Sequence, residues 1–225
     1  MKNKICLVIC LVFFGVLLGG CSISIKDVID KTSDFRHHYF LTQTDFGNIE
    51  FYCGQRELEY EYNGISTKKV DYGIISISLK EKLNEKTLPI SLCVDDYTYN
   101  IILEQNPFDD SYMYDIEKQV NPSSNIVVKF NTNKFPDTIL ECQSSKWKID
   151  SSTALEISSK CLQDILKDNS KNGKDFECYL RISHNIQNNE MLYFWTFSVK
   201  TNDLKSSSVV IDVNSGEILV KRIGV

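Results

Sequence analysis

Apolar residues in the middle of this chain recur at every second position, and this pattern restricts the fold more than any other feature. The clearest stretch is residues 57–62, in which Leu58, Tyr60 and Tyr62 alternate with three glutamates. Successive side chains of a β-strand point to opposite faces, so we expect one face to be buried and the other wet. The same alternation over residues 35–142 predicts a β-rich domain at residues 35–143.

Turn signals divide this region into short strands. Asn63-Gly64 tolerates positive φ at both positions and predicts a hairpin that leads into a strand over residues 70–79. Two further strand pairs are predicted, at residues 89–94 with 97–103 around Asp95-Asp96, and at residues 112–116 with 126–130 around Asn121-Pro122. About six to eight short strands without a long helix favour a small β-sandwich or an open barrel.

Two residue types in this region could carry a binding site. Tyrosine is frequent, and its side chains either fill a half-exposed sheet or form a surface that recognises a ligand by stacking. The pairs Asp95-Asp96 and Asp109-Asp110 have turn character and lack the spacing of a calcium loop, so no metal site is predicted.

The periodicity changes from two to 3.6 after Lys148. Helical spacing connects Ala154, Ile157, Cys161, Leu162 and Ile165. Thr153 and Glu156 fit a capping box, with Ser151 or Ser152 as alternative caps. The helix is expected to end before residues 169–174, and strands are predicted over residues 176–182, 193–199, 208–213 and 217–223. One helix on one face of an antiparallel sheet gives an α+β layer pair over residues 146–225.

The tail resembles a known family. The helix is preceded by Trp147-Lys148-Ile149-Asp150 and followed by Tyr193-Phe194-Trp195-Thr196-Phe197, and residues 209–219 read Val-Val-Ile-Asp-Val-Asn-Ser-Gly-Glu-Ile-Leu. This order resembles the PepSY and PepSY-like domains of secreted and membrane-bound bacterial proteins, over about a third of the chain. Members of that family are propeptide and accessory modules, some of which inhibit proteases or modulate cell-wall enzymes. The resemblance implies an accessory role and no catalytic residues.

Trp195 and Phe197 are the candidate partner-binding residues. They share one face of their strand, whereas Phe194 and Thr196 share the other. Because the helix covers only one face, the simplest expectation places Trp195 in the core. The alternative makes Trp195 and Phe197 anchors for a partner peptide or for the neighbouring domain.

The first 20 residues have the features of a processing signal. Lys2 and Lys4 precede an apolar run over residues 5–18, which is shorter than the roughly 20 residues that span a bilayer. The run ends in Leu18-Gly19-Gly20-Cys21, which resembles the lipobox of bacterial lipoproteins. This resemblance implies cleavage between Gly20 and Cys21 and a lipid, with acyl chains such as palmitate, on the Cys21 thiol. The alternatives are a plain cleaved signal peptide and a short membrane anchor.

The charge of the chain bears on its partners. A formal net charge of -5 and a pI near 5.3 argue against nucleic acid, whose binding depends on Lys and Arg contacts to phosphates. Loss of the signal segment removes two lysines and no acidic residue, which brings the charge to about -7. Two or three acyl chains anchor a protein without a basic patch. Residues 21–34 are therefore expected to be a lipidated tether, with the acidic body standing off the extracytoplasmic face of the cell membrane.

Five cysteines follow Cys21 in the sequence. Their number is odd and none forms a C-x-x-C motif, which argues against a disulfide framework and against a zinc site. We expect them to be mostly buried thiols that pack as small apolar side chains.

No motif of this sequence indicates catalysis. It contains no G-x-S-x-G elbow, H-E-x-x-H motif, Walker loop or dinucleotide fingerprint. His37 and His38 are adjacent, so on a strand they point to opposite faces, and His184 is the third histidine of the chain. We therefore expect no catalytic residue, no metal and no cofactor.

Two non-enzymatic functions follow as hypotheses. In the first, a membrane-anchored lipoprotein uses its PepSY-like tail as an accessory module that binds or restrains an extracytoplasmic hydrolase, such as a protease or a cell-wall hydrolase, or a peptide. In the second, the β-rich domain carries a site for a solute, glycan or peptide, and the tail is a spacer.

Overall fold

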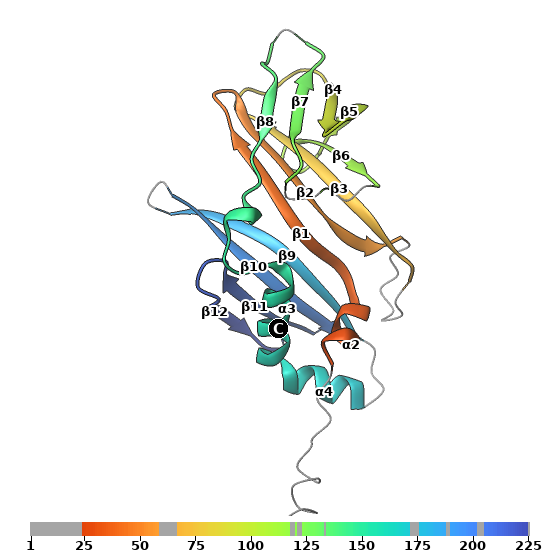
Figure 1. Ribbon diagram of the computed structural model, residues 1–225, viewed down its shortest axis with the longest axis vertical. Helices are drawn as coiled ribbons and strands as arrows, with labels where there is room; N and C mark the ends of the chain where they lie inside the picture. Colours follow the sequence, from red (N-terminus) through yellow and green to blue (C-terminus); the bar gives the residue numbers. More distant parts are fainter. Residues whose placement is uncertain are drawn as a thin grey trace, which may run out of the picture.

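The described part of the chain is mainly β. The computed structural model describes residues 24–58, 67–117, 120, 123–132, 134–171, 176–187, 190–201 and 205–224. Within these residues, twelve strands form one sheet in the order β12-β11-β10-β9-β1-β2-β3-β6-β5-β4-β7-β8 (Figure 1). The strands are β1 (Thr32–Gln43), β2 (Gly47–Glu57), β3 (Lys69–Leu79), β4 (Thr87–Val94), β5 (Tyr97–Gln105), β6 (Tyr112–Ile116), β7 (Ile126–Phe130), β8 (Thr138–Leu140), β9 (Phe176–Gln187), β10 (Glu190–Thr201), β11 (Ser206–Asp212) and β12 (Ile218–Arg222). The helices are α2 (Ile25–Asp30), the 3-10 helix η1 (Ser144–Lys146), α3 (Ser151–Cys161) and α4 (Gln163–Lys171).

The first eight strands curl into a cylinder. β8 pairs with β7, and the residues after β8 return to β1, the first strand of this set. The backbone N–H of Leu41 donates to the carbonyl of Glu141 at 3.0 Å. The N–H of Gln143 donates to the carbonyl of Tyr39 at 2.8 Å. These hydrogen bonds close the ring of strands. The structure is therefore nearer to the barrel alternative than to the sandwich, with its ring closed rather than open.

One face of these eight strands forms a single apolar core. The residues alternate along each strand as the period-two pattern predicts, and the largest are Phe40, Ile49, Phe51, Ile75, Ile77, Ile90, Leu92, Leu103 and Tyr112. Burial of this face removes most of its apolar area from water, which is the main favourable contribution to folding.

Most predicted strands of this region are confirmed, but one pairing is wrong. The hairpin around Asp95-Asp96 forms as β4 and β5, and Asp95 has a φ of 50°. β6 and β7 have the predicted bounds but do not pair with each other. β6 pairs with β3 and β5, whereas β7 pairs with β4 and β8. Strand order depends on contacts between distant segments, which the local pattern does not specify.

The expected face pattern at the end of β2 is also wrong. Glu57 is only 5% exposed and Leu58 is 52% exposed, the reverse of the expectation. The Glu57 carboxylate accepts a hydrogen bond from the backbone N–H of Thr67 at 3.1 Å, which compensates the burial of its charge. Tyr60, Tyr62 and the Asn63-Gly64 turn lie outside the described residues.

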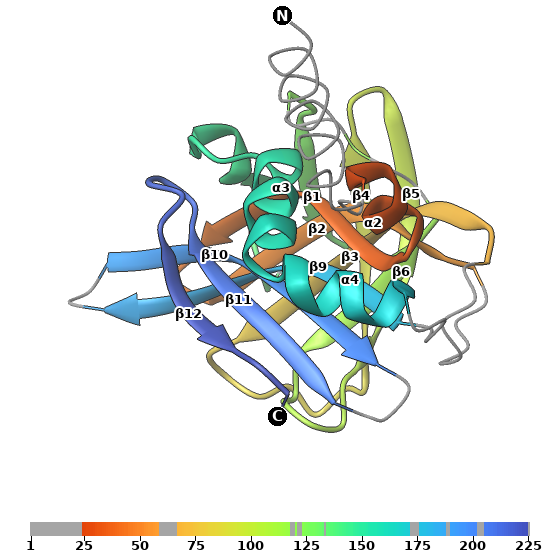
Figure 2. The same cartoon turned by 90° about the horizontal axis from the view of Figure 1, so that it is seen from below.

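The last four strands carry helices on one face. β9, β10, β11 and β12 are antiparallel, and α3 packs against β10 and β11 (Figure 2). The second core lies between these helices and the sheet, and it includes Leu155, Leu162, Leu166, Leu180, Trp195, Phe197, Val209 and Ile211. This is the helix-on-sheet layer pair that the change of periodicity predicts.

The helical segment differs from the expectation at both ends and in the middle. Asp150 is the N-cap of α3, and its carboxylate accepts from the N–H of Thr153 at 2.7 Å, so none of the three expected caps is used. The segment is interrupted at Leu162, and α4 continues to Lys171, beyond the expected end.

The chain has two parts: the cylinder of β1 to β8, and the tail, which contains α3, α4 and β9 to β12. They share one sheet through β1. Thr32, Asp34 and Phe35 of β1 pair in parallel with β9 of the tail. Val28 of α2 and Phe35, which lies on the first strand of the cylinder, both belong to the second core. From Ser24 onward the expected tether is therefore wrong, because these residues form α2 and the start of β1 and pack on the tail.

All five cysteines after Cys21 are free thiols. Cys53 and Cys178 are buried, and the other three are half-buried. Burial raises the pKa of the Cys53 thiol to about 11, and it also raises the pKa of Cys178. These two thiols therefore remain protonated at neutral pH and behave as apolar side chains.

Replacing Gly216 by Val is expected to destabilise the protein by about 1–2 kcal/mol. Gly216 has a φ of 75° in the turn between β11 and β12, and an added Cβ would lie 3.2 Å from Ile149 Cδ1. Urea denaturation followed by circular dichroism measures the change. Gly216→Asn is the matched control, because Asn adopts positive φ more readily and should cost less. Equal stability of Gly216→Val and the wild type would contradict this turn geometry.

Candidate functional site

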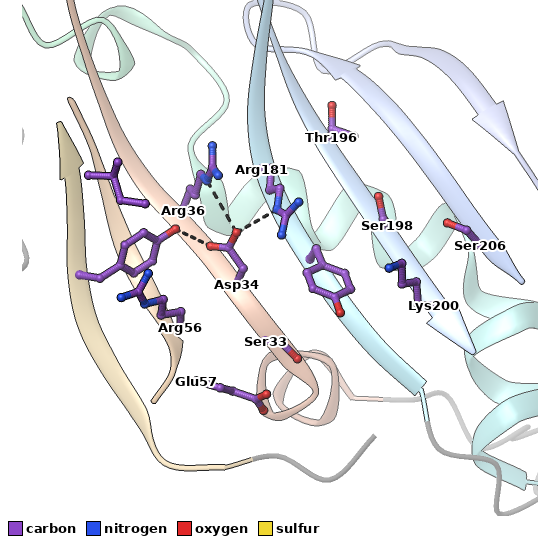
Figure 3. Close-up of a pocket in the computed structure, with 13 residues that line it drawn as sticks. Ser33, Asp34, Arg36, Arg56, Glu57, Arg181, Thr196, Ser198, Lys200 and Ser206 are labelled. Carbon is purple, nitrogen blue, oxygen red and sulfur yellow. Dashed lines mark hydrogen bonds and ion pairs between the residues drawn. The ribbon is translucent and has the colours of Figure 1, made fainter. Parts of the chain in front are cut away.

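A polar groove of about 470 Å³ lies on the face of the sheet opposite the helices. Its side chains come from both parts of the chain: β1, β2 and β3 on one side, and β9, β10 and β11 on the other (Figure 3). Side chains alternate across a strand, so the residues between the buried positions of β10 point into this groove. These residues are Thr196, Ser198 and Lys200.

Strand pairing brings the groove residues into rows. On β1, Asp34 is paired with Arg56 of β2 and with Tyr179 of β9. On β9, Arg181 is paired with Thr196 of β10. Neighbouring strands lie roughly 4.8 Å apart, so a charged side chain on one strand reaches those of the next.

A bulge in β1 and a glycine in β2 allow close packing beside the groove. The register of β1 against β2 shifts between Arg36 and His38. Gly54 is paired with Arg36, and a Cβ at this position would lie 2.1 Å from the Phe35 carbonyl oxygen. A side chain at position 54 would therefore push β2 away from β1 and displace Arg36.

Asp34 is the centre of the charge network. Its carboxylate accepts a hydrogen bond from Arg181 Nε at 2.8 Å and lies 3.7 Å from Arg36 Nε. The hydroxyl of Tyr72 donates a hydrogen bond to the same carboxylate (Figure 3). The Asp34 side chain is 14% exposed, so these contacts compensate a largely desolvated charge.

Aromatic rings hold the guanidinium groups in place. Arg36 lies 3.9 Å from the ring centre of Tyr52, and Arg181 lies 5.1 Å from that of Tyr179. Arg56 lies 4.8 Å from the ring of Tyr72, and it also pairs with Asp115 at 2.6 Å. Stacked and ion-paired arginines have lost much of their rotamer freedom, so a ligand that binds them pays less ordering entropy.

The groove carries more positive than negative groups. It is lined by the cations of Arg36, Arg56, Arg181 and Lys200, against the carboxylates of Asp34 and Glu57. Burial, followed by the nearby Asp34 charge, raises the pKa of Tyr72, so its phenol stays neutral and remains a donor. This local surplus is notable in a chain whose net charge is -5.

The pKa of Arg36 shows the influence of its neighbours. Burial alone would lower this pKa, but the nearby Tyr52, Asp34 and Tyr72 together outweigh burial and raise it. The Arg36 guanidinium therefore remains charged. Its Nε is buried and has no hydrogen-bond partner among the described residues, beyond the 3.7 Å ion pair.

The arrangement suits recognition of an anionic group. Guanidinium groups bind carboxylate and phosphate in bidentate fashion, and the hydroxyls of Thr196, Ser198 and Ser206 offer further donors. Among the described residues, no group of three or more His, Cys, Asp or Glu side chains is placed to hold a metal ion.

Of the site residues predicted from the sequence, the structure describes only Trp195 and Phe197. Gly20 and Cys21 lie outside the described residues. Trp195 and Phe197 share one face as expected, but both are fully buried in the second core, on the side of the sheet opposite the groove. As surface anchors for a partner they are therefore wrong, and the core alternative is the one that their burial supports.

The histidines are distributed over the junction of the two parts. His37 Nδ1 lies 3.3 Å from Ser151 Oγ, and His184 Nδ1 lies 3.4 Å from the Tyr39 hydroxyl. Burial lowers the pKa of His37, so its ring tends to be neutral. No hydrogen bond joins His37 to a carboxylate within the described ranges, so the pair lacks the third member of a catalytic triad.

Sequence reasoning missed every charged residue of the groove. Asp34 was assigned to the tether, and Arg36, Arg56, Arg181 and Lys200 were not singled out. The partners Asp34 and Arg181 are 147 residues apart in sequence. A partial signal was the alternation of Thr196, Ser198 and Lys200 on β10, which marks the face that the helices do not cover.

The fold and groove define a class: a mainly β chain with a cation-rich binding groove between its two parts. No family model matches the chain, no curated protein matches it, and no solved structure matches it. No helix of the described segments is long and apolar enough to cross a bilayer.

Proposed function

We propose that this chain is a lipid-anchored extracytoplasmic lipoprotein that acts as a non-catalytic binding module and takes an anionic group of its ligand, a carboxylate or a phosphate, in the groove. The observation that carries this proposal is the convergence of four cationic side chains from β1, β2, β9 and β10. These cations gather in a chain that is acidic as a whole.

The kinds of side chain favour binding over proton transfer. Arginine is charged at every physiological pH, so Arg36, Arg56 and Arg181 are poor general acids or bases and good anion ligands. Tyr72, with its raised pKa, is likewise a hydrogen-bond donor rather than a base.

The position of the groove changes the choice between the two sequence-based hypotheses. The first assigned binding to the tail and the second assigned it to the β-rich domain. The groove takes Arg56 from one part and Lys200 from the other, so neither part alone forms it. We propose that both parts bind one ligand together. A hydrolase or peptide partner fits this proposal if it presents a carboxylate, and an anionic glycan fits equally.

Lys200→Gln is expected to weaken binding of an anionic probe about two- to fivefold, because the loss of one exposed charge contact costs roughly 0.5–1 kcal/mol. The measurement is isothermal titration of the mature chain with two probes: oligomeric glycerol phosphate, and a wall peptide with free carboxylates. The uncharged controls are glycerol and the fully amidated peptide.

Lys129→Gln is the matched variant, because Lys129 is also an exposed lysine on a strand and lies outside the groove. It should bind like the wild type. Equal affinities of the Lys200 and Lys129 variants for the probe that binds, or no binding of either anionic probe, would contradict the proposal.

A further inference from the structure

The first described helix is tightly fixed at its N-terminus. Ser24 caps α2, and its backbone N–H donates to Asp27 Oδ2 at 3.1 Å while its hydroxyl accepts from the Asp27 N–H at 3.1 Å. This reciprocal capping box satisfies the donors at the start of the helix. The start of α2 is therefore held by its own cap.

Helix α2 is also fixed to the body. Val28 is buried in the second core, and the Thr32 hydroxyl donates to the Val28 carbonyl at 2.6 Å. The N–H of Cys178 in β9 donates to the Lys31 carbonyl at 2.8 Å. Lys69 Nζ donates to the Ile29 carbonyl at the end of the helix. The helix thus cannot swing away from the sheet as a tether would.

Very little chain separates this fixed helix from the predicted lipid site. Only Ser22 and Ile23 lie between Cys21 and Ser24. Three Cα–Cα steps span at most about 11 Å, however they are arranged. We propose that the end of the body that carries α2 rests directly on the bilayer surface, an inference that depends on the lipid anchor of the proposed function.

The face at this end is formed by α2 and α4. Both helices lie at the same end of the molecule in Figure 1, and Figure 2 shows that end toward the viewer. Their exposed or half-exposed residues carry both signs of charge: Lys26, Asp27, Asp30, Asp164, Lys167 and Asp168. Because this surface is not basic, electrostatic attraction to anionic lipids does not hold it there. The short connection to the acyl chains imposes the contact.

This orientation places one end of the groove near the membrane. Ser33 and Glu57 line the groove beside α2 (Figure 3). A ligand that enters from this end comes from the layer just above the headgroups. The opposite end of the body, beyond Gln43 of β1, projects away from the bilayer.

Fluorescence quenching on vesicles tests the orientation. The lipidated mature chain is reconstituted into vesicles of phosphatidylglycerol and phosphatidylethanolamine that contain a headgroup nitroxide lipid. An environment-sensitive fluorescent amino acid replaces Ile29 or, as the control, Ile139. Ile29 is 37% exposed on α2, and Ile139 is 62% exposed on β8. The Ile139 carbonyl accepts from the Thr42 hydroxyl, and Thr42 lies roughly 33 Å along β1 from Thr32.

We expect the probe at position 29 to be quenched and the probe at position 139 to keep its emission. Insertion of about 16 Gly and Ser residues between Ile23 and Ser24 adds a spacer of roughly 22 Å and should abolish the quenching at position 29. Mass spectrometry of Cys21 distinguishes failure of the proposed orientation from failure of the lipoprotein proposal. If the nitroxide lipid quenched both probes of a lipidated protein to the same extent, or quenched neither, the orientation alone would be overturned. An unmodified Cys21 would overturn the orientation and the lipoprotein proposal together, while leaving the anion-binding groove open to its own titration.

Discussion

Replacing Trp195 by Ala is expected to lower the free energy of unfolding by about 3–5 kcal/mol. Trp195 is fully buried at the centre of the second core. Its truncation removes the largest side chain of that core and leaves a cavity between β10 and α3. It also removes the hydrogen bond from Trp195 Nε1 to the Ile149 carbonyl, at 2.8 Å, and the edge contact with Trp147 at 5.4 Å.

Urea denaturation followed by far-ultraviolet circular dichroism measures this loss. Phe194→Ala is the matched control, because Phe194 directly precedes Trp195 on β10, points to the other face and is half-buried. It should cost clearly less than Trp195→Ala. If Trp195→Ala left stability unchanged and abolished binding of a partner, the burial of Trp195 would be contradicted and the anchor alternative restored.

Local patterns in the sequence predicted most elements of the fold. The alternation of apolar and polar residues located β3 to β7, and the change to helical spacing located α3. The strands predicted over residues 208–213 and 217–223 leave Gly216 in the turn between them, and this residue has a positive φ. These features depend on a few neighbouring residues, which is why a single sequence is sufficient to find them.

The joining of the two parts depends on distant contacts. The local sequence around Phe35 contains nothing that selects β9, more than 140 residues away, as a parallel neighbour of β1. Such pairing is decided by the total area buried when Val28 and Phe35 join the second core. The tether assignment was therefore wrong for the residues that connect the two parts.

The groove could not be predicted from the sequence for the same reason. Arg56 and Arg181 belong to strands with ordinary alternation, and they become neighbours of Asp34 only after β1 has paired on both sides. The burial of Glu57 against the Thr67 N–H is a further consequence of tertiary structure. A sequence pattern predicts that charged residues near strand ends are exposed to solvent. Only the folded structure shows which of these residues lie close to one another.

Asp34→Asn is expected to have two opposite effects: lower stability and tighter binding of an anion. The amide retains the size of the carboxylate and can still accept from the Tyr72 hydroxyl, but it no longer balances Arg36 and Arg181. Two cations close to one another, one of them largely buried, then lack their common counter-ion. The cost should be about 2 kcal/mol, less than for a fully buried ion pair because Arg181 is partly solvated.

The gain in affinity follows from the same charge. In the wild type, Asp34 occupies the guanidinium groups that an incoming carboxylate or phosphate would contact. Its neutralisation removes both the competition and the repulsion, and we expect roughly tenfold tighter binding of glycerol phosphate oligomers at low salt, equivalent to about 1.4 kcal/mol. The gain should shrink as salt is added, because partly exposed charges are screened.

Asp115→Asn distinguishes this effect from a general loss of negative charge. Asp115 pairs with Arg56 at 2.6 Å and is 41% exposed, so its change should cost at most about 1 kcal/mol in stability and alter affinity less than Asp34→Asn does. Urea denaturation and titration calorimetry on the same preparations give both quantities. Weaker anion binding by Asp34→Asn would show that Asp34 positions the arginines for the ligand and does not compete with it, and the groove would then be an anion site that requires its internal carboxylate.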